Sequence, residues 1–255
     1  MAINTIHFVC GLGQTEGKPF ADVDLLAFRL AAKYHPTAEI FVHTSNTIGT
    51  GDNYKAVPKL RRVTYDKSLY GGFDNWQFTK GEHMSDKLRL HVLLSCKSDN
   101  ALYLDTDAYC VSNLDHLSDI EGCAMARLSD FQIAHGLIYA GKDRSFIQKW
   151  YNKLNTVIGP PKSALDYSCR MPHELAITTP GLTVLDAQQY HGVVCDAIRD
   201  GFWSKTPALY TISDLITTSR VIHLMSPRPA IDSWTMYAKM LVYLPDLLEQ
   251  PKANT

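Results

Sequence analysis

The chain has 255 residues, of which 45% are hydrophobic and 20% charged, and its 25 Lys and Arg balance 26 Asp and Glu. This length supports one sizeable domain with its own core, and the balanced charge excludes nucleic-acid binding through bulk electrostatics. No apolar run approaches the roughly 20 residues that a membrane helix requires. The N-terminus carries no basic and apolar leader, so the sequence predicts a protein without a membrane span, and the cytoplasm is its expected location.

The first half of the chain predicts alternating strands and helices. Residues 5–12 form an apolar run that glycines close, which predicts a buried first strand. Apolar residues at helical spacing predict a helix over 21–35, and residues 39–44 predict the second strand. Residues 45–82 are rich in Gly, Asn, Lys and Tyr and contain one short strand-like piece at 60–65. Such a long irregular segment is more often functional than idle.

The next unit, residues 83–115, is the most informative. Ser85 is a candidate N-cap for a mostly buried helix over 86–96. ALYLD at 101–105 predicts a buried strand with acids at its carboxyl end, where open α/β sheets bind ligands. No repeat or linker is visible, so we expect one domain over residues 1–255. The remaining expected elements are a strand at 135–140, a helix at 143–155, a loop at 171–182, a strand at 220–225 and a helix near 234–248.

Asp105 and Asp107 follow the buried strand at positions i and i+2, which predicts that they point the same way. Two adjacent carboxylates repel each other unless a cation or hydrogen-bond donors lie between them. A hard divalent ion, Mn²⁺ or Mg²⁺, suits such oxygen ligands and keeps substrate phosphates in its shell. The alternative is that both acids cap a turn or pair with surface Lys and Arg. The helix and strand that precede them favour the metal.

Two classes of enzyme place Asp-x-Asp at the end of a strand. Phosphohydrolases of the haloacid dehalogenase type use the first Asp as nucleophile. Their motif lies near the N-terminus, however, and continues with Thr or Val where this chain has Tyr109. Sugar-nucleotide transferases instead use the acids to hold a metal on the donor diphosphate. A third alternative is a protein that binds sugar nucleotides or glycans without turnover.

Residues 83–115, HMSDKLRLHVLLSCKSDNALYLDTDAYCVSNLD, carry a resemblance to a known family. Their Ser-Asp-x-x-Arg helix and Tyr-Leu-Asp-x-Asp strand resemble the motif of the family 32 glycosyltransferases and, more distantly, the catalytic domain of the large clostridial glucosylating toxins. IHFVCGLG, HGLIYAGKDRSFIQKWY, ITTPGLTVL and IHLMSPRPAIDSW are similar to other landmarks of this family. The resemblance implies an α/β protein with the GT-A fold: a single Rossmann-like domain with a central mixed, mostly parallel sheet flanked by helices.

The resemblance also implies an activity. It is a retaining transfer from a UDP- or GDP-sugar to a glycan or other hydroxyl acceptor, with Mn²⁺ or Mg²⁺ as cofactor. By matching positions, Asp105 and Asp107 would bind the metal, with His223 as third ligand. Asp86 and Arg89 lie on one helix face and would contact the donor sugar and its diphosphate. Apart from His223, these residues form the expected catalytic set.

Further residues are expected to contact the substrates. The family's first strand offers a Trp to stack on the base where this chain has Cys10, so we expect Phe8 or Tyr103 in that role. On the acceptor side we expect Glu174, beside a Thr-Pro-Gly loop, and His135, which stands where the family commonly has Asn. The full nucleotide-sugar set comprises Phe8, Val9, Asp86, Arg89, Tyr103, Asp105, Thr106 and Trp234.

Overall fold

The structure, a computed structural model, describes residues 1–10, 12, 19–44, 51–65, 81–157, 165–190, 216–223 and 246–249. Its strands are β1 (Thr5–Cys10), β2 (Glu39–Thr44), β3 (Leu60–Thr64), β4 (Ala101–Leu104), β5 (Ala108–Cys110), β6 (Cys123–Ser129), β7 (Gln132–Ala140), β8 (Leu182–Leu185) and β9 (Val221–His223). Its α-helices are α1 (Asp22–Tyr34), α3 (Gly81–Ser95), α4 (Ser145–Asn155), α5 (Met171–Thr178), α6 (Ala187–Tyr190) and α10 (Asp246–Glu249). Short 3-10 helices cover Asn53–Ala56 and Asp115–Asp119, and a π-helical turn covers Asp166–Arg170.

Within the described residues, seven strands form one sheet in the order β3–β2–β1–β4–β7–β6–β8. Neighbouring strands are parallel except where β7 pairs antiparallel with β4 and with β6. The expected α/β architecture with a mixed, mostly parallel sheet is therefore confirmed. β5 and β9 form a separate antiparallel pair.

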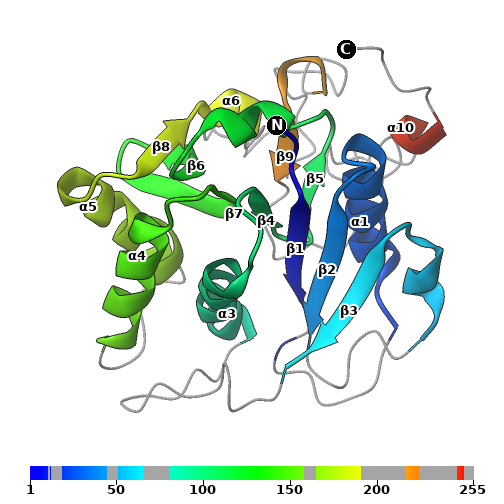
Figure 1. The fold of residues 1–255 in the computed structure, drawn as a ribbon, viewed down its shortest axis with the longest axis horizontal. Coiled ribbons are helices and arrows are strands. Elements are labelled where there is room, and N and C mark those ends of the chain that lie inside the picture. Colours follow the sequence, from blue (N-terminus) through cyan, green and yellow to red (C-terminus); the bar gives the residue numbers. More distant parts are fainter. Residues whose placement is uncertain are drawn as a thin grey trace, which may run out of the picture.

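Helices cover both faces of the sheet, with α1 on one face and α3 and α4 on the other (Figure 1). Alternate side chains of β1 enter two different cores, because successive residues of a strand point to opposite faces. Phe8 packs edge-on against Phe28 of α1, with ring centroids 4.8 Å apart. Val9 joins the other core together with Leu88 of α3. Burial of each such side chain contributes about 1.5–3 kcal/mol to folding.

Arg144, immediately before α4, fixes the C-terminal end of α3. Its guanidinium donates to the carbonyl oxygen of Leu93 at 2.5 Å and to those of Cys96 and Ser98. Carbonyls at the end of a helix have no partner within the helix, so this contact satisfies them and ties α3 to α4. The sheet and α4 thus hold α3 in place, and with it the Asp86 and Arg89 side chains near the middle of the helix.

Several secondary-structure predictions were wrong. α3 begins at Gly81, so Ser85 lies inside the helix and does not cap it. Residues 171–178 form α5 rather than a loop: the π-helical turn Asp166–Arg170 leads directly into this helix, which tolerates Pro172 near its start. β6 and β8 were not predicted at all. The expected helix near 234–248 lies outside the described residues except for the start of α10.

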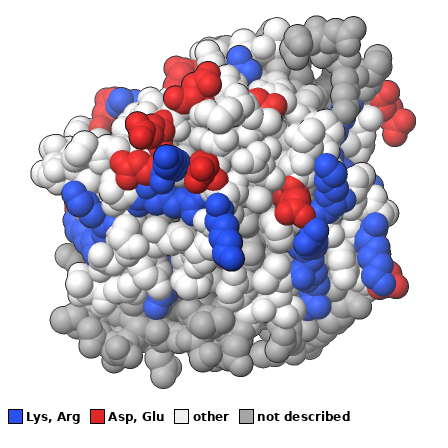
Figure 2. All heavy atoms as spheres, in the orientation of Figure 1, with Lys and Arg blue, Asp and Glu red and all other residues white. Residues whose placement is uncertain are grey.

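The described surface agrees with the balanced composition. On the face shown in Figure 2, basic and acidic side chains lie beside one another, and its described residues form no continuous basic surface. None of the helices in the described part of the chain combines the length and the apolar character that crossing a bilayer demands.

Candidate active site

Asp105 and Asp107 lie in the turn that follows β4, not within the strand as the alternation argument assumed. The N–H of Ala108 donates to the carbonyl oxygen of Asp105 at 3.0 Å, which closes a tight turn. The N–H of Asp105 donates to the carbonyl oxygen of Gly136 on β7 at 2.9 Å. The turn is therefore anchored to the sheet, and it presents both carboxylates at the carboxyl end of β4.

His223 reaches the two acids through a pairing of distant segments. β9 pairs with β5 so that His223 lies opposite Ala108, the residue after Asp107. The Nε2 atom of His223 lies 3.2 Å from Oδ1 of Asp107 and 3.7 Å from Oδ2 of Asp105. One ligand atom from each of these three side chains lies within 4.8 Å of the others. A single ion could bridge atoms at this spacing.

Gly136 leaves room for the His223 ring beside β7. The sequence did not predict this role for Gly136. A Cβ atom at residue 136 would lie 2.4 Å from both Cε1 and Nδ1 of His223. The imidazole therefore packs directly on the backbone of β7. Burial lowers the pKa of His223, but the carboxylates of Asp107 and Asp105 raise it more, so this pKa lies above its ordinary value.

Arg89 organises the acids from the side of α3. Its Nη2 atom lies 3.1 Å from Oδ1 of Asp86, and its Nη1 atom lies 3.2 Å from Oδ1 of Asp105. Its Nε atom donates to the carbonyl oxygen of Ser85, and its guanidinium lies 4.8 Å from the centre of the Tyr103 ring. Burial lowers the pKa of Arg89, but Asp105, Tyr103 and Asp86 together raise it above its ordinary value. The buried cation therefore has the partners that such a charge requires.

The two aromatic residues expected to stack on a base are both fully buried. Phe8 lies in the core against Phe28, and Tyr103 lies beneath Arg89. Neither ring has the free face that stacking requires, so the expectation of base stacking was wrong for both. Tyr103 instead donates its hydroxyl to Oδ1 of Asp105 at 2.5 Å. Burial raises the pKa of Tyr103 well above its usual value, which keeps this donor protonated.

His135 lies beside the acids. Its Nε2 atom is 3.4 Å from Oδ2 of Asp105, and its Nδ1 atom is 3.2 Å from Sγ of Cys169 in the π-helical turn. Burial and the Arg89 charge lower the pKa of His135 to about 4, so the imidazole is neutral at physiological pH. Burial also raises the pKa of Cys169 to about 12, so this side chain is a thiol and not a thiolate.

The other expected residues are placed as follows. Thr106 lies in the turn between the two acids, and Val9 is buried on the α3 face of the sheet. Glu174 is exposed on α5, and its Oε2 atom lies 3.3 Å from Nζ of Lys153. None of its described contacts is with Asp105 or Asp107. Trp234 lies outside the described residues.

Compared by sequence, the chain matches no family model and no curated protein. Compared by structure, it is similar to the galactosyltransferase LgtC in complex with donor and acceptor sugar analogs, with a TM-score of 0.54 and 13% identity over 98% of this chain and 97% of that one. It is also similar to the apo-form glycosyltransferase GlyE of Streptococcus pneumoniae (TM-score 0.55, 11% identity, 98% of this chain and 63% of that one). The bifunctional glycosyltransferase WbbM gives a TM-score of 0.55 at 9% identity over 99% of this chain and 52% of that one. These similarities show that the chain has the GT-A fold.

Proposed function

We propose that this chain is a metal-dependent, retaining glycosyltransferase that moves a sugar from a UDP- or GDP-sugar to a glycan or other hydroxyl acceptor. The observation that carries the proposal is the convergence of Asp105, Asp107 and His223 at the carboxyl end of β4. Ligands of open α/β sheets bind at this end of the strands. The fold shared with LgtC, which was solved with sugar analogs, supports the same reading. The family 32 assignment remains part of this proposal.

The three side chains fit a divalent ion. They offer two carboxylates and one imidazole, a mixture of oxygen and nitrogen ligands that suits Mn²⁺ better than Mg²⁺. When bound, the ion would neutralise the negative charge that develops on the departing diphosphate. Asp105, Asp107 and His223 would hold it.

The surrounding residues orient Asp105 for this role. Its Oδ1 atom already receives the Tyr103 hydroxyl and faces Arg89, whereas its Oδ2 atom faces His135 and His223. Oδ2 is therefore the oxygen left for a ligand. Cys169 is a protonated thiol beside His135 and is not an activated nucleophile. A retaining transfer requires no protein nucleophile if the acceptor attacks on the face that the diphosphate leaves.

Incubation with Mn²⁺ and a panel of UDP- and GDP-sugars tests the proposal against its two alternatives. Slow release of free sugar together with nucleoside diphosphate supports the transferase. Release of inorganic phosphate from sugar phosphates, without diphosphate release from the panel, would support a phosphohydrolase. Binding of the nucleotide sugar without turnover, even with acceptors supplied, would support a non-catalytic binding protein.

Asp86→Asn should lower kcat about 100-fold while the Kd of the nucleoside diphosphate changes less than about threefold. The reason is that Asp86 and Arg89 form a buried pair proposed to contact the donor sugar, whereas the metal ligands stay in place. Steady-state kinetics and calorimetry on the same preparation measure the two quantities. Asp99→Asn, at an exposed position, is the matched control. An equal loss of affinity for the diphosphate and for the nucleotide sugar would contradict the role in sugar binding.

Gly136→Ala should weaken Mn²⁺ binding by about tenfold or more, because the new methyl group would displace the His223 ring from the acids. Isothermal titration with Mn²⁺ measures this effect. Gly51→Ala is the control, because it adds the same methyl group at a residue with no described contact to the acids. The nearest atom to a Cβ at residue 51 would be in Pro19, at 3.2 Å. Native Mn²⁺ affinity in folded Gly136→Ala protein would show that the position of His223 does not matter for metal binding.

A further inference from the structure

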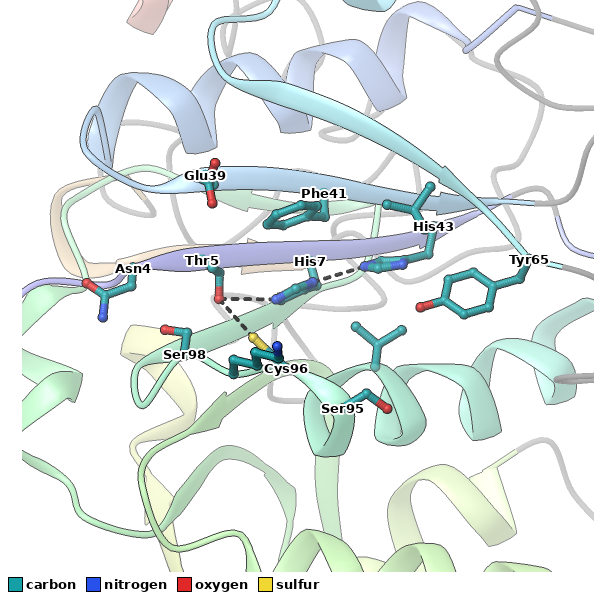
Figure 3. A pocket seen from close by; sticks show the side chains of 13 residues that line it. Asn4, Thr5, His7, Glu39, Phe41, His43, Tyr65, Ser95, Cys96 and Ser98 are labelled. Carbon is teal, nitrogen blue, oxygen red and sulfur yellow. Dashed lines mark hydrogen bonds between the residues drawn. The ribbon is translucent and has the colours of Figure 1, made fainter.

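His135 has two ring nitrogens that face chemically different partners. His7 and His43 are a simpler case. They lie on the adjacent strands β1 and β2, where Nδ1 of His7 is 2.9 Å from Nε2 of His43, so one neutral ring donates to the other (Figure 3). Nδ1 of His135 instead lies 3.2 Å from Sγ of Cys169, and its Nε2 lies 3.4 Å from Oδ2 of Asp105. The ring therefore connects the π-helical turn to the proposed metal site.

The side chain of Cys169 is a thiol that can donate its proton. The residue is 1% exposed, and burial raises the pKa of the thiol to about 12, so the S–H bond is intact at physiological pH. The hydroxyl of Ser168 donates to Sγ at 3.8 Å, so the sulfur itself acts as an acceptor toward that neighbour. The thiol proton can therefore point to Nδ1 of His135.

The charge on Asp105 decides which nitrogen of His135 carries the ring proton. A neutral imidazole has one N–H donor and one nitrogen lone pair. With the proton on Nδ1, the lone pair of Nε2 would face the carboxylate, and the two would repel each other. With the proton on Nε2, the N–H dipole points to Oδ2 of Asp105, and Nδ1 accepts the thiol proton of Cys169. Contacts of this kind are often long in a site without substrate and shorten when it binds.

Regular elements of the fold hold these contacts in place. β7 carries His135, and its next residue accepts the backbone N–H of Asp105 through its carbonyl oxygen at 2.9 Å. The π-helical turn carries Cys169, and the carbonyl oxygen of Tyr167 in the same turn accepts from Nε1 of Trp150 on α4 at 3.1 Å. π-helical turns are rare and are frequently found at functional sites. The thiol, the imidazole and the carboxylate are thus all fixed to the sheet or to α4.

We propose that Cys169 and His135 are positioning residues for Asp105: the thiol fixes the Nε2–H tautomer of the imidazole, and this N–H holds Oδ2 of the carboxylate toward the proposed metal position. A carboxylate oxygen has two lone pairs, so Oδ2 can accept from His135 and also bind an ion. It lies 3.7 Å from Nε2 of His223, the proposed third ligand. Removing a group that orients a metal ligand typically lowers metal affinity by roughly 10- to 100-fold. Only this effect on metal binding rests on the proposed function.

Selective ¹⁵N-histidine labelling of the metal-free protein tests the tautomer directly. Long-range ¹H–¹⁵N spectra separate protonated from unprotonated ring nitrogens, and the signals that His135→Gln removes belong to His135. We expect a proton on Nε2 and none on Nδ1. Asp105→Asn should move the Nε2–H proton resonance upfield, because it removes the charge that deshields this proton. A proton on Nδ1 in the native protein, or an Nε2–H resonance that Asp105→Asn leaves unchanged, would overturn the proposal.

Cys169→Ala and Cys169→Ser test the thiol, because the two variants differ by one hydroxyl group. Cys169→Ala should move the Nδ1 nitrogen resonance of His135 downfield in the metal-free protein, since this nitrogen loses its donor. In calorimetry, Cys169→Ala should also weaken Mn²⁺ binding about tenfold. Cys169→Ser replaces the donor and should restore both properties. Cys96→Ala, which removes a half-buried thiol beyond the end of α3, is the control and should change neither.

The result separates this proposal from the proposed function. Equal Mn²⁺ affinity and an equal Nδ1 resonance in Cys169→Ala and Cys169→Ser would show that the thiol does not position His135. A native protein that binds no Mn²⁺ would refute the metal-dependent function instead. In that case the spectra of the metal-free protein alone decide whether the thiol and the carboxylate fix the tautomer of His135.

Discussion

Replacing Asp107 with asparagine should abolish Mn²⁺-dependent binding of the nucleotide sugar and lower turnover by about 100-fold or more. The substitution keeps the size and shape of the side chain but removes the negative charge that a divalent ion requires. The side chain of Asp107 is buried, but the residue lies in the turn after β4, so no strand pairing of the sheet involves it. We therefore expect the loss of function with a melting temperature close to that of the native protein. Calorimetry with Mn²⁺, and then with nucleotide in the presence of Mn²⁺, measures the effect.

Asp130→Asn is the control for this variant, because Asp130 is an exposed acid in the turn between β6 and β7. It removes the same charge at a position without a described contact to the proposed ligands, and it should bind Mn²⁺ as the native protein does. If Asp107→Asn and Asp130→Asn both retain native affinity for Mn²⁺ and nucleotide, the metal assignment is wrong.

Acidification from pH 7 to pH 5 should destabilise the fold by on the order of 3 kcal/mol through His7 and His43 alone. Their pKa values lie at about 3 and about 4 in the folded protein, below the usual value of 6.5. Between pH 7 and pH 5, His7 and His43 therefore bind protons in the unfolded chain but remain neutral in the folded one. The contribution of the two neutral imidazoles to the free energy of unfolding is present above pH 6.5 and is lost as the pH falls below that value.

Urea unfolding at pH 7, 6 and 5 measures this loss. A double variant, His7→Phe with His43→Phe, keeps an aromatic ring at each position but removes both titrating groups, so its stability should fall less over the same range. His173→Gln is the control, since His173 lies on α5, away from His7 and His43. The same loss of stability in the native protein and in the double variant would show that these imidazoles are not the buried neutral groups described here.

The parts of the fold with one dominant pattern could be predicted from sequence. β1, β2 and α1 have clear apolar periods, with Gly11 after β1 and Pro36 after α1, and all three lie where they were expected. β6 was missed because its buried residues include small alanines, which carry little strand preference. α5 was missed because its Pro and Thr residues suggested a loop, although Pro172 occupies a position that a helix tolerates.

The sequence predicts only those site residues whose positions follow from their immediate neighbours in the chain. Asp105 and Asp107 follow a recognisable strand, and their position at its carboxyl end needed no other information. The place of His223 depends on the pairing of β5 with β9, two three-residue strands that are too short for a periodic signal. The role of Gly136 follows from the close approach of the His223 ring, which only the three-dimensional structure reveals.

A crystal structure with Mn²⁺ and a nucleoside diphosphate, recorded with anomalous data at the manganese edge, tests the central claim most directly. We expect one strong anomalous peak about 2.0–2.4 Å from a carboxylate oxygen of Asp107 and from Nε2 of His223, with the diphosphate completing its coordination shell. We also expect Oδ2 of Asp105 to face this ion, directly or through a water molecule. A manganese peak elsewhere in the molecule, or a diphosphate bound away from the turn after β4, would contradict this claim.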